Sequence, residues 1–246
     1  MHRYQILIEY AGTNFVGWQI QPKGKSIQKS VQTKLSNLLK EKISLIGSGR
    51  TDAGVHAIEQ SAHFECKKKI QNLNKFLKSV NHFVNDMNIS IINIKKRNIN
   101  FHARFSAKQR IYKYVIFNRL SRPSIEKGRG WHIINELDIS LMKKGAKKLL
   151  GTKDFSTFRS SSCNAKSPIR TMKSIKIKSI KGRIEIQFKS QSFLQQQVRS
   201  MVGCLKYLAE KKWDLKKFNF VLKSKKRALC APPAPAGGLF LEKIIY

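Results

Sequence analysis

The sequence predicts an α+β protein made of two related halves, each with an antiparallel or mixed sheet flanked by helices. Its 246 residues are enough for two cores of about 120 residues each. Short segments alternate apolar and polar residues as strands do, and longer segments space apolar residues as helices do. Both halves contain a similar set of these segments, which predicts two copies of one architecture.

The first half, residues 1–104, alternates strands and helices. Tyr4–Tyr10 (YQILIEY) has the alternation of a strand, and Ser26–Lys42 has apolar residues at helical spacing, with Ser26 as the expected cap. A glycine-rich loop follows at Gly47–Ala57. The remaining predicted elements are a strand at Gln60–Cys66, a helix at Leu73–Phe83 and a strand at Ile89–Ile94. The outline is βαβαβ.

The second half, residues 105–246, is predicted to start after a boundary within Asn100–Ala107. Its first strand is Arg110–Asn118 (RIYKYVIFN). The later elements are a helix near Ile139–Leu150, a hairpin of Met172–Lys178 and Arg183–Lys189, helices at Leu194–Ala209 and Leu215–Leu222, and a strand at Leu239–Ile245.

The charge of the chain indicates a polyanionic partner. There are 49 Lys and Arg residues against 14 Asp and Glu, which gives a net charge of +35 and a pI near 10.4. Nucleic acid is the first partner to consider for such a chain. The alternative is that an AT-rich genome, which enriches Lys, Asn and Ile together, produces part of this excess.

Other classes of protein find little support in the sequence. No apolar run approaches the roughly 18 to 20 residues that span a bilayer, and the start of the chain lacks the apolar core of a signal peptide, so we expect a cytoplasmic protein with no membrane contact. The four cysteines lie far apart, with no histidine at zinc-ligand spacing. We therefore expect reduced structural thiols and no metal site.

The glycine-rich loop GSGRTDAGVHA is the most informative segment. Its spacing is G-x-G-x-x-D, so Asp52 stands where a dinucleotide fingerprint has its third glycine, and no Gly-Lys-Ser/Thr follows to make a phosphate loop. Arg50 and Asp52 are two residues apart and would point to the same side of an extended loop. The pair suits an ionised carboxylate used as nucleophile or base. A tight turn in which the pair serves only to hold the loop stays open.

The same loop resembles the catalytic loop of the tRNA pseudouridine synthase A family, whose pattern is close to GAGRTDAGVHA. The resemblance covers nearly the whole chain and is specific, since its motifs occur in the family's order. These motifs are Glu9–Gln19, Ser26–Gln28, Gly47–Ala57, His63–Phe64, Phe101–Ala107, Tyr112–Tyr114, Asp154–Arg159, Val198–Gly203 and Ala234–Leu241. The resemblance implies the pseudouridine synthase fold, with a catalytic cleft between its two halves.

The resemblance also implies roles for individual residues. Asp52 matches the family's nucleophile, Tyr112 the aromatic ring that stacks on the target uracil, and Arg199 the basic partner of the aspartate. Arg50 matches the residue that supports flipping of the base. Two segments match parts of the family that touch tRNA, and their residues are Phe101, His102, Ala103, Arg104 and Phe105 in one, and Ser162, Cys163, Asn164, Ala165 and Lys166 in the other.

Two of these residues also have a reading from the sequence alone. Tyr112 lies in an alternating strand, where it could equally be a packed residue of a sheet. Arg199 lies among Val198, Met201 and Val202 on an apolar helix. An unpaired guanidinium buried there would destabilise the fold. It should therefore have a carboxylate partner, for which Asp52 is our expectation.

The activity implied by the resemblance is isomerisation of uridine to pseudouridine at positions 38, 39 and 40 in the anticodon stem-loop of tRNAs, by an intramolecular transferase that needs no cofactor. The resemblance also implies a homodimer. The competing hypothesis is a non-catalytic basic RNA-binding protein or chaperone. A pure binder has no use for a carboxylate among phosphates, so the presence of Asp52 argues against it.

Overall fold

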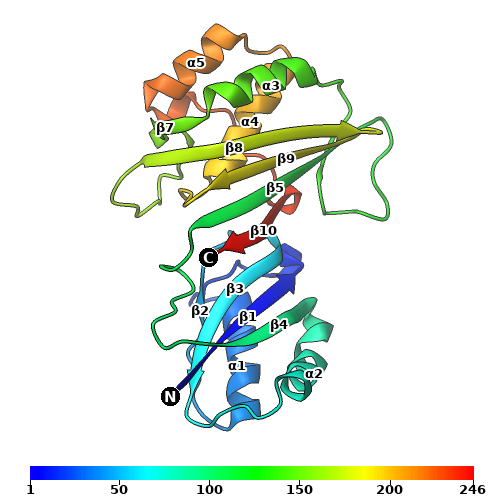
Figure 1. Cartoon of the computed structure of the whole chain (residues 1–246). Coiled ribbons are helices and arrows are strands. Elements are labelled where there is room, and N and C mark those ends of the chain that lie inside the picture. Colours follow the sequence, from blue (N-terminus) through cyan, green and yellow to red (C-terminus); the bar gives the residue numbers. More distant parts are fainter. The chain divides into compact units, whose positions relative to one another are not determined.

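The computed structural model describes residues 1–246, which form two compact units. Unit 1 comprises residues 1–108 and 240–246, and unit 2 comprises residues 109–239. The chain thus leaves unit 1, builds unit 2 and returns to unit 1 within its last strand (Figure 1). The sequence patterns place that strand in the second half, but from Phe240 onward it belongs to unit 1, because it pairs there with a strand of unit 1.

The sheet of unit 1 has the order β4-β1-β3-β10, with a short β2 beside β3. The bounds of these strands are β1 His2–Tyr10, β2 Ile46–Gly47, β3 His56–Cys66, β4 Ile89–Arg97 and β10 Leu239–Ile245. Strand β1 runs antiparallel to both β3 and β4. Strand β10 is parallel to β3, with Phe240 opposite His56. The sheet is therefore mixed, as expected from the sequence.

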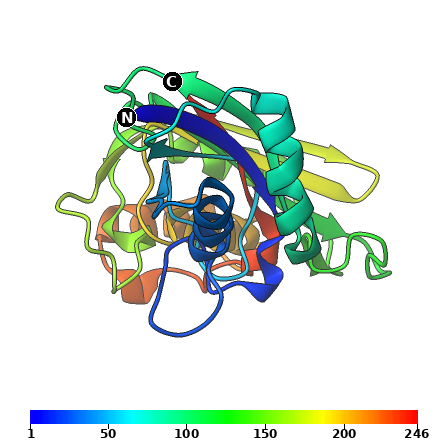
Figure 2. The ribbon, with the colours of Figure 1, turned by 90° about the horizontal axis from the view of Figure 1, so that it is seen from below.

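Two helices pack on one face of this sheet, α1 (Ile27–Leu39) and α2 (Leu73–Val84). Tyr4, Ile6 and Ile8 of β1 are almost fully buried, and α1 lies on one side of the arc of β1 in Figure 2. Helix α2 contacts both α1 and β4. The side chain of Ser26 accepts a hydrogen bond from the amide of Lys29, which confirms the predicted helix cap.

The strands of unit 2 pair in the order β5-β9-β8-β7, and β6 pairs with β5. The bounds of these strands are β5 Gln109–Asn118, β6 Trp131–Ile133, β7 Gly151–Asp154, β8 Ile169–Ile180 and β9 Arg183–Ser190. The helices are α3 Ile139–Lys148, α4 Gln197–Ala209 and α5 Leu215–Ser224. They contact one another, and α3 contacts β8, so this unit also combines a sheet with helices.

The hairpin of β8 and β9 turns at Lys181 and Gly182, where it was predicted. The φ angles of these residues are 47° and 73°. Two consecutive positive φ angles are typical of the type I′ turn that fits the twist of a hairpin. The two strands are antiparallel, with Ile180 opposite Arg183.

The bounds of some elements differ from the predicted ones. Strand β3 begins at His56, inside the segment predicted as loop, because Ala57 pairs with both Tyr10 and Leu241. Helix α4 begins at Gln197 instead of Leu194, because Gln196 has a left-handed backbone with φ 60°. The chain also contains five short 3-10 helices, η1 Gly12–Asn14, η2 Asn85–Met87, η3 Ser156–Phe158, η4 Arg227–Leu229 and η5 Ala236–Gly238.

Candidate active site

The loop of Asp52 connects β2 to β3 in unit 1. Its backbone makes a tight turn, in which the carbonyl of Asp52 accepts a hydrogen bond from the amide of Val55 at 3.2 Å. Asp52 is half-buried, whereas Arg50 is exposed. The side-chain Nε2 of Gln60 in β3 donates to the carbonyl of Gly49 at 2.8 Å. The carboxylate therefore sits in a loop whose two ends are fixed by the sheet.

The segment of residues 12–18, just after β1, packs against the backbone of the Asp52 loop. The amide of Trp18 donates to the carbonyl of Thr51 at 3.0 Å. Gly17 has a φ of 110°, and a Cβ atom there would lie 2.6 Å from the same Thr51 oxygen. A Cβ atom at Gly12 would overlap the carbonyl of Val55. Only glycine allows the two backbones to approach this closely.

A buried hydroxyl pair adds a second contact at the loop. The Tyr10 and Thr51 hydroxyl oxygens are 2.8 Å apart, and both side chains are buried. Thr51 immediately precedes Asp52, so this hydrogen bond fixes the backbone next to the carboxylate. The sequence patterns predict no individual role for Tyr10, Gly12, Gly17 or Thr51. Their only signal was that Glu9–Gln19 and Gly47–Ala57, in which they lie, resemble motifs of the family.

Tyr112 lies in β5 of unit 2, opposite Phe188 of β9. It is 7% exposed, and its ring meets the ring of Phe193 edge to face, with centroids 5.1 Å apart. Tyr114 lies two residues further along, on the same face of the strand. Its hydroxyl donates to the carbonyl of Pro235 at 2.8 Å, and burial raises its pKa well above the ordinary value of tyrosine. The Tyr114 phenol is therefore neutral and structural.

Arg199 lies on α4, as predicted, and is attached to the segment Ala234–Gly238. Its Nε donates to the carbonyl of Ala234 at 2.7 Å, and its own carbonyl accepts from the amide of Ala234 at 3.0 Å. Tyr114 binds the next residue, Pro235, of the same segment. The structure of unit 2 thus connects α4 and β5 through one loop, which was recognised in the sequence only as a matching motif.

The segment Phe101–Phe105 forms a compact turn on unit 1. The Nδ1 atom of His102 accepts from the amides of Arg104 and Phe105 at 3.2 and 3.3 Å. Phe105 is 76% exposed, and the Arg104 guanidinium lies 5.7 Å from the centre of its ring. Ala103 is fully buried. Of this segment, His102, Arg104 and Phe105 therefore offer side chains to a ligand, whereas Ala103 offers none.

His63 of β3 anchors this turn and gives it a pH dependence. Its Nδ1 accepts from the amide of Ala103 at 3.1 Å, and its ring packs 4.8 Å from that of His102. Burial, together with the charges of His102 and Arg3, lowers the pKa of His63 from 6.5 to about 4, although Glu65 acts in the opposite direction. The folded protein therefore contains a neutral His63 under neutral and mildly acidic conditions.

We expect this buried imidazole to weaken the fold in acid. Between pH 6.5 and 4 the unfolded chain binds a proton at His63 that the folded chain does not bind. The free energy of unfolding therefore decreases as the pH is lowered, by up to about 3 kcal/mol. His63→Asn, which keeps an acceptor near the Nδ1 position, should lose less stability over this range. Urea titrations of both proteins at several pH values measure the difference. Equal losses would show that His63 does not cause the effect.

The second predicted RNA-contact segment, Ser162–Lys166, is a loop of unit 2 before β8. The side chains of Ser162, Asn164 and Lys166 are exposed, and those of Cys163 and Ala165 are half-buried. The Ser162 hydroxyl lies 3.0 Å from that of Ser160. The loop offers two hydrogen-bonding groups and one cation at its surface.

The candidate residues are thus divided between the units. Asp52, Arg50 and the turn of residues 101–105 lie in unit 1, and Tyr112, Arg199 and the loop of residues 162–166 lie in unit 2. No group of three His, Cys, Asp or Glu side chains is placed to hold a metal ion. None of the helices has both the length and the apolar character needed to cross a membrane.

Comparison with known proteins places both units in one class. The family model described as tRNA pseudouridine synthase matches residues 6–106 and again residues 146–246. These two stretches contain the Asp52 loop and Arg199, and the duplicate match agrees with the two α+β halves described above.

The chain belongs to this tRNA pseudouridine synthase family. It is 81% identical to the tRNA pseudouridine synthase A of Pelagibacter ubique, over 100% of both chains. It is 38% identical to the protein of that name from Parvibaculum lavamentivorans over 100% of both chains. It is 40% identical to the one from Wolbachia pipientis, over 99% of this chain and 100% of the relative.

Proposed function

We propose that this protein isomerises uridine to pseudouridine at positions 38, 39 and 40 of the tRNA anticodon stem-loop, with Asp52 as the nucleophile. Membership in the family supports the activity and the tRNA substrate. So does the 81% identity, over the full length of both chains, to the tRNA pseudouridine synthase A of Pelagibacter ubique. The resemblance of the sequence motifs to the tRNA pseudouridine synthase A family supports positions 38, 39 and 40. The observation that carries the role of Asp52 is its braced loop, in which close glycine contacts and a buried hydroxyl pair fix the residues on either side of it.

The reaction is an exchange of one glycosidic bond for another. The N1–C1′ bond breaks, the uracil turns while it stays bound, and C5 bonds to C1′; the proton lost from C5 is balanced by the one gained at N1. A carboxylate can assist by attacking C1′, by adding to C6, or by taking the C2′ proton. Asp52 supplies this group, Arg199 its basic partner, and Tyr112 the ring on which uracil turns.

The target base must leave its helical stack before it can react. Unstacking costs a few kcal/mol, which basic and polar contacts with the RNA offset. Arg50 is exposed beside Asp52 and is suited to support the flipped state. Arg104 and Phe105 add a cation and an exposed ring, a combination that binds both phosphate and base.

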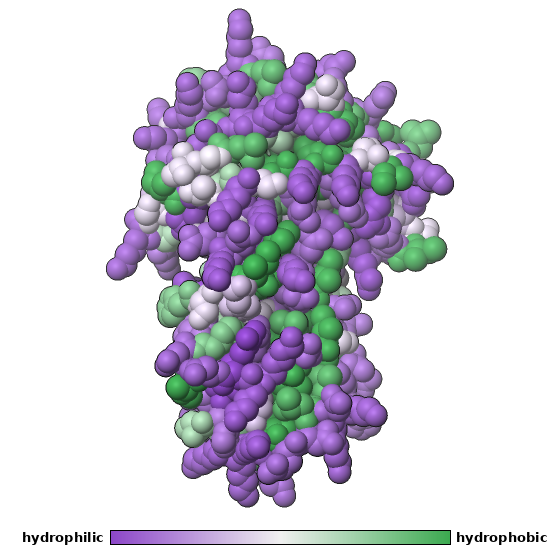
Figure 3. All heavy atoms as spheres, in the orientation of Figure 1, coloured by the Kyte–Doolittle hydropathy of each residue, from purple (hydrophilic) through white to green (hydrophobic).

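The surface agrees with a nucleic-acid substrate. Hydrophilic side chains dominate the face of each unit that Figure 3 shows. Because the net charge is +35, most of the charged groups at the surface are cations that attract phosphates.

The direct test is to incubate the protein with unmodified tRNA transcripts and map pseudouridines by carbodiimide labelling and primer extension. We expect stops at positions 38, 39 and 40 wherever the transcript has uridine there. Stops elsewhere would contradict the proposed positions, and their complete absence would contradict the activity.

Two further features of the family are part of the proposal. We expect a homodimer, so that one subunit holds the body of the tRNA while the other acts on the anticodon arm; sedimentation equilibrium measures the mass. Since the substrate is tRNA, we expect the enzyme to act in the cytoplasm.

The support of the catalytic loop can be tested at Gly17. In Gly17→Ala the new Cβ meets the Thr51 carbonyl and the φ of 110° is strained, so we expect a loss of about 1–3 kcal/mol in stability and a larger loss of activity in the folded fraction, because Asp52 moves with Thr51. Thermal melts and initial rates of pseudouridine formation measure the two effects.

The matched control is Gly128→Ala. Gly128 has a φ of 77°, but a Cβ atom there meets nothing within 4 Å. It carries the backbone strain without the collision, so its activity should stay near that of the parent. If both variants lost activity equally, strain in general and not the contact with Thr51 would be responsible.

A further inference from the structure

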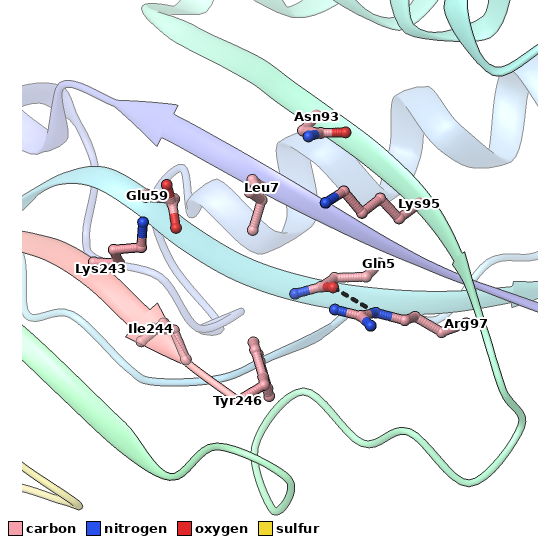
Figure 4. A pocket seen from close by; sticks show the side chains of 9 residues that line it. All are labelled: Gln5, Leu7, Glu59, Asn93, Lys95, Arg97, Lys243, Ile244 and Tyr246. Atoms are coloured by element: carbon pink, nitrogen blue, oxygen red, sulfur yellow. Dashed lines mark hydrogen bonds between the residues drawn. The ribbon is translucent and has the colours of Figure 1, made fainter.

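A pocket lies on the face of the unit 1 sheet that α1 and α2 do not cover. Along β1, Tyr4, Ile6 and Ile8 are buried on the helix face, whereas Gln5 and Leu7 point to the other. There they border a pocket of about 230 Å³, in front of the strands in Figure 4. Its polar lining comes from β3, β4, β10 and the residue after it: Glu59, Asn93, Lys95, Arg97, Lys243 and Tyr246.

The lining has the composition of an anion site. Three cations, Lys95, Arg97 and Lys243, face the single carboxylate of Glu59. Both lysines are exposed at the rim, where their ammonium groups can reach a ligand. The side-chain amide of Asn93 adds a hydrogen-bonding group beside the cations. A phosphate needs this combination of charge and donors.

Arg97 is oriented before any ligand arrives. Its Nε donates to Oε1 of Gln5 at 2.8 Å, as Figure 4 shows, and its guanidinium lies 4.8 Å from the centre of the Phe101 ring. Gln5 is only 5% exposed, and its own amide donates to the hydroxyl of Ser61 at 2.8 Å. The guanidinium plane is thus held by two contacts while its terminal nitrogens make no hydrogen bond to the protein. A fixed guanidinium fork suits bidentate contact with phosphate.

The pocket shares a wall with the turn of residues 101–105. The centre of the Phe101 ring lies 4.9 Å from that of the Tyr246 ring. The same Phe101 ring also packs on the guanidinium of Arg97. The Tyr246 hydroxyl donates to the carbonyl of Ala103 at 2.9 Å, and its oxygen lies 2.7 Å from the hydroxyl oxygen of Ser61. A strand of RNA that touches Arg104 and Phe105 would therefore reach this pocket within the same unit.

We infer that this pocket binds a phosphate of the tRNA backbone, next to the contact made by residues 101–105. The inference rests on the proposed function in one respect, that tRNA is the ligand. Arg97 supplies the bidentate contact, and Lys95 and Lys243 supply point charges at the rim. The pocket thus adds to the affinity for tRNA without touching the reacting base.

The test compares two double variants that remove the same charge. Lys95→Gln/Lys243→Gln changes the pocket, and Lys29→Gln/Lys78→Gln changes exposed lysines on α1 and α2. Filter binding of unmodified tRNA over a salt series gives the dissociation constant and its salt slope. We expect the pocket variant to bind about three- to tenfold more weakly and its slope to fall by up to about 0.7–0.9, the contribution of one phosphate contact. The helix variant should stay near the parent in both.

Equal weakening in both double variants would overturn the inference, because it would show only long-range attraction. Arg97→Lys should weaken binding too, since a point charge replaces the fixed fork; unchanged affinity would overturn the role of Arg97. Calorimetry with inorganic phosphate forms a second arm: tight phosphate binding that the pocket variant loses, with unchanged tRNA affinity, would assign the pocket to free phosphate. Because binding is measured without catalysis, absence of pseudouridine in the parent reaction would contradict only the proposed function.

Discussion

Replacement of Asp52 by Asn is expected to abolish pseudouridine formation while tRNA binding is retained or becomes slightly tighter. Asn is close to Asp in size and still accepts a hydrogen bond, but it is neither a nucleophile nor a base at neutral pH. The turn closed by the Asp52 carbonyl and the Val55 amide does not involve the side chain and should survive. Tritium release from tRNA that contains 5-³H-uridine measures the chemistry, and a gel-shift titration measures the binding.

The control for charge is Asp86→Asn, at an exposed position in η2. Both variants remove one negative charge from a strongly basic protein, so any general gain in affinity should appear in both. If Asp52 served only to hold its loop, the variant would instead lose about 1 kcal/mol of stability and keep the activity of its folded fraction. Substantial tritium release by Asp52→Asn would refute the nucleophile assignment.

Arg199→Ala is expected to lose most of the activity and part of the stability. The substitution removes the Nε donor that binds the carbonyl of Ala234 at 2.7 Å, and with it the guanidinium proposed to assist Asp52. Arg199→Lys should restore only part of the rate, because an ammonium group cannot reproduce a planar fork. Steady-state kinetics and thermal melts of both variants separate the two losses.

Arg227→Ala is the matched control for that experiment. Arg227 also binds α4, through a hydrogen bond of 2.7 Å to the hydroxyl of Ser200. Its removal should lower the melting temperature and leave kcat unchanged. If Arg199→Ala behaved in the same way, with a lower melting temperature and full activity, Arg199 would be a structural residue and its proposed role would be wrong.

The longer elements of this fold could be predicted from sequence because each has its own periodicity. Helix α1 repeats Ile27, Val31 and Leu35 on its buried face, and the hairpin turn at Lys181 and Gly182 has its own local signal. Strands β2, β6 and β7 were missed, because their 2, 3 and 4 residues are too few to show a period. They are strands only because β3, β5 and β8 pair with them.

The candidate site was predictable where one segment contains the signal. The Asp52 loop is such a segment, but its support comes from Gly12 and Gly17, which are about forty residues earlier in the chain. Nothing local indicates that these glycines meet Val55 and Thr51. The connection of Arg199 and Tyr114 through Ala234 and Pro235 is equally non-local. A motif gives the identity of such residues, and only the folded chain shows what they touch.

The return of β10 to unit 1 has a consequence for how the protein is made. The ribosome completes residues 109–239 before it adds Phe240–Tyr246, so a nascent unit 1 lacks one strand of its sheet throughout the synthesis of unit 2. In that interval the edge of β3 near His56 does not yet pair with Phe240. Ser61 and Ala103 do not yet have their hydrogen bonds with the Tyr246 hydroxyl. Domains usually fold in the order in which they are translated. Here the unit that begins first is completed only after the whole of unit 2 has been synthesised.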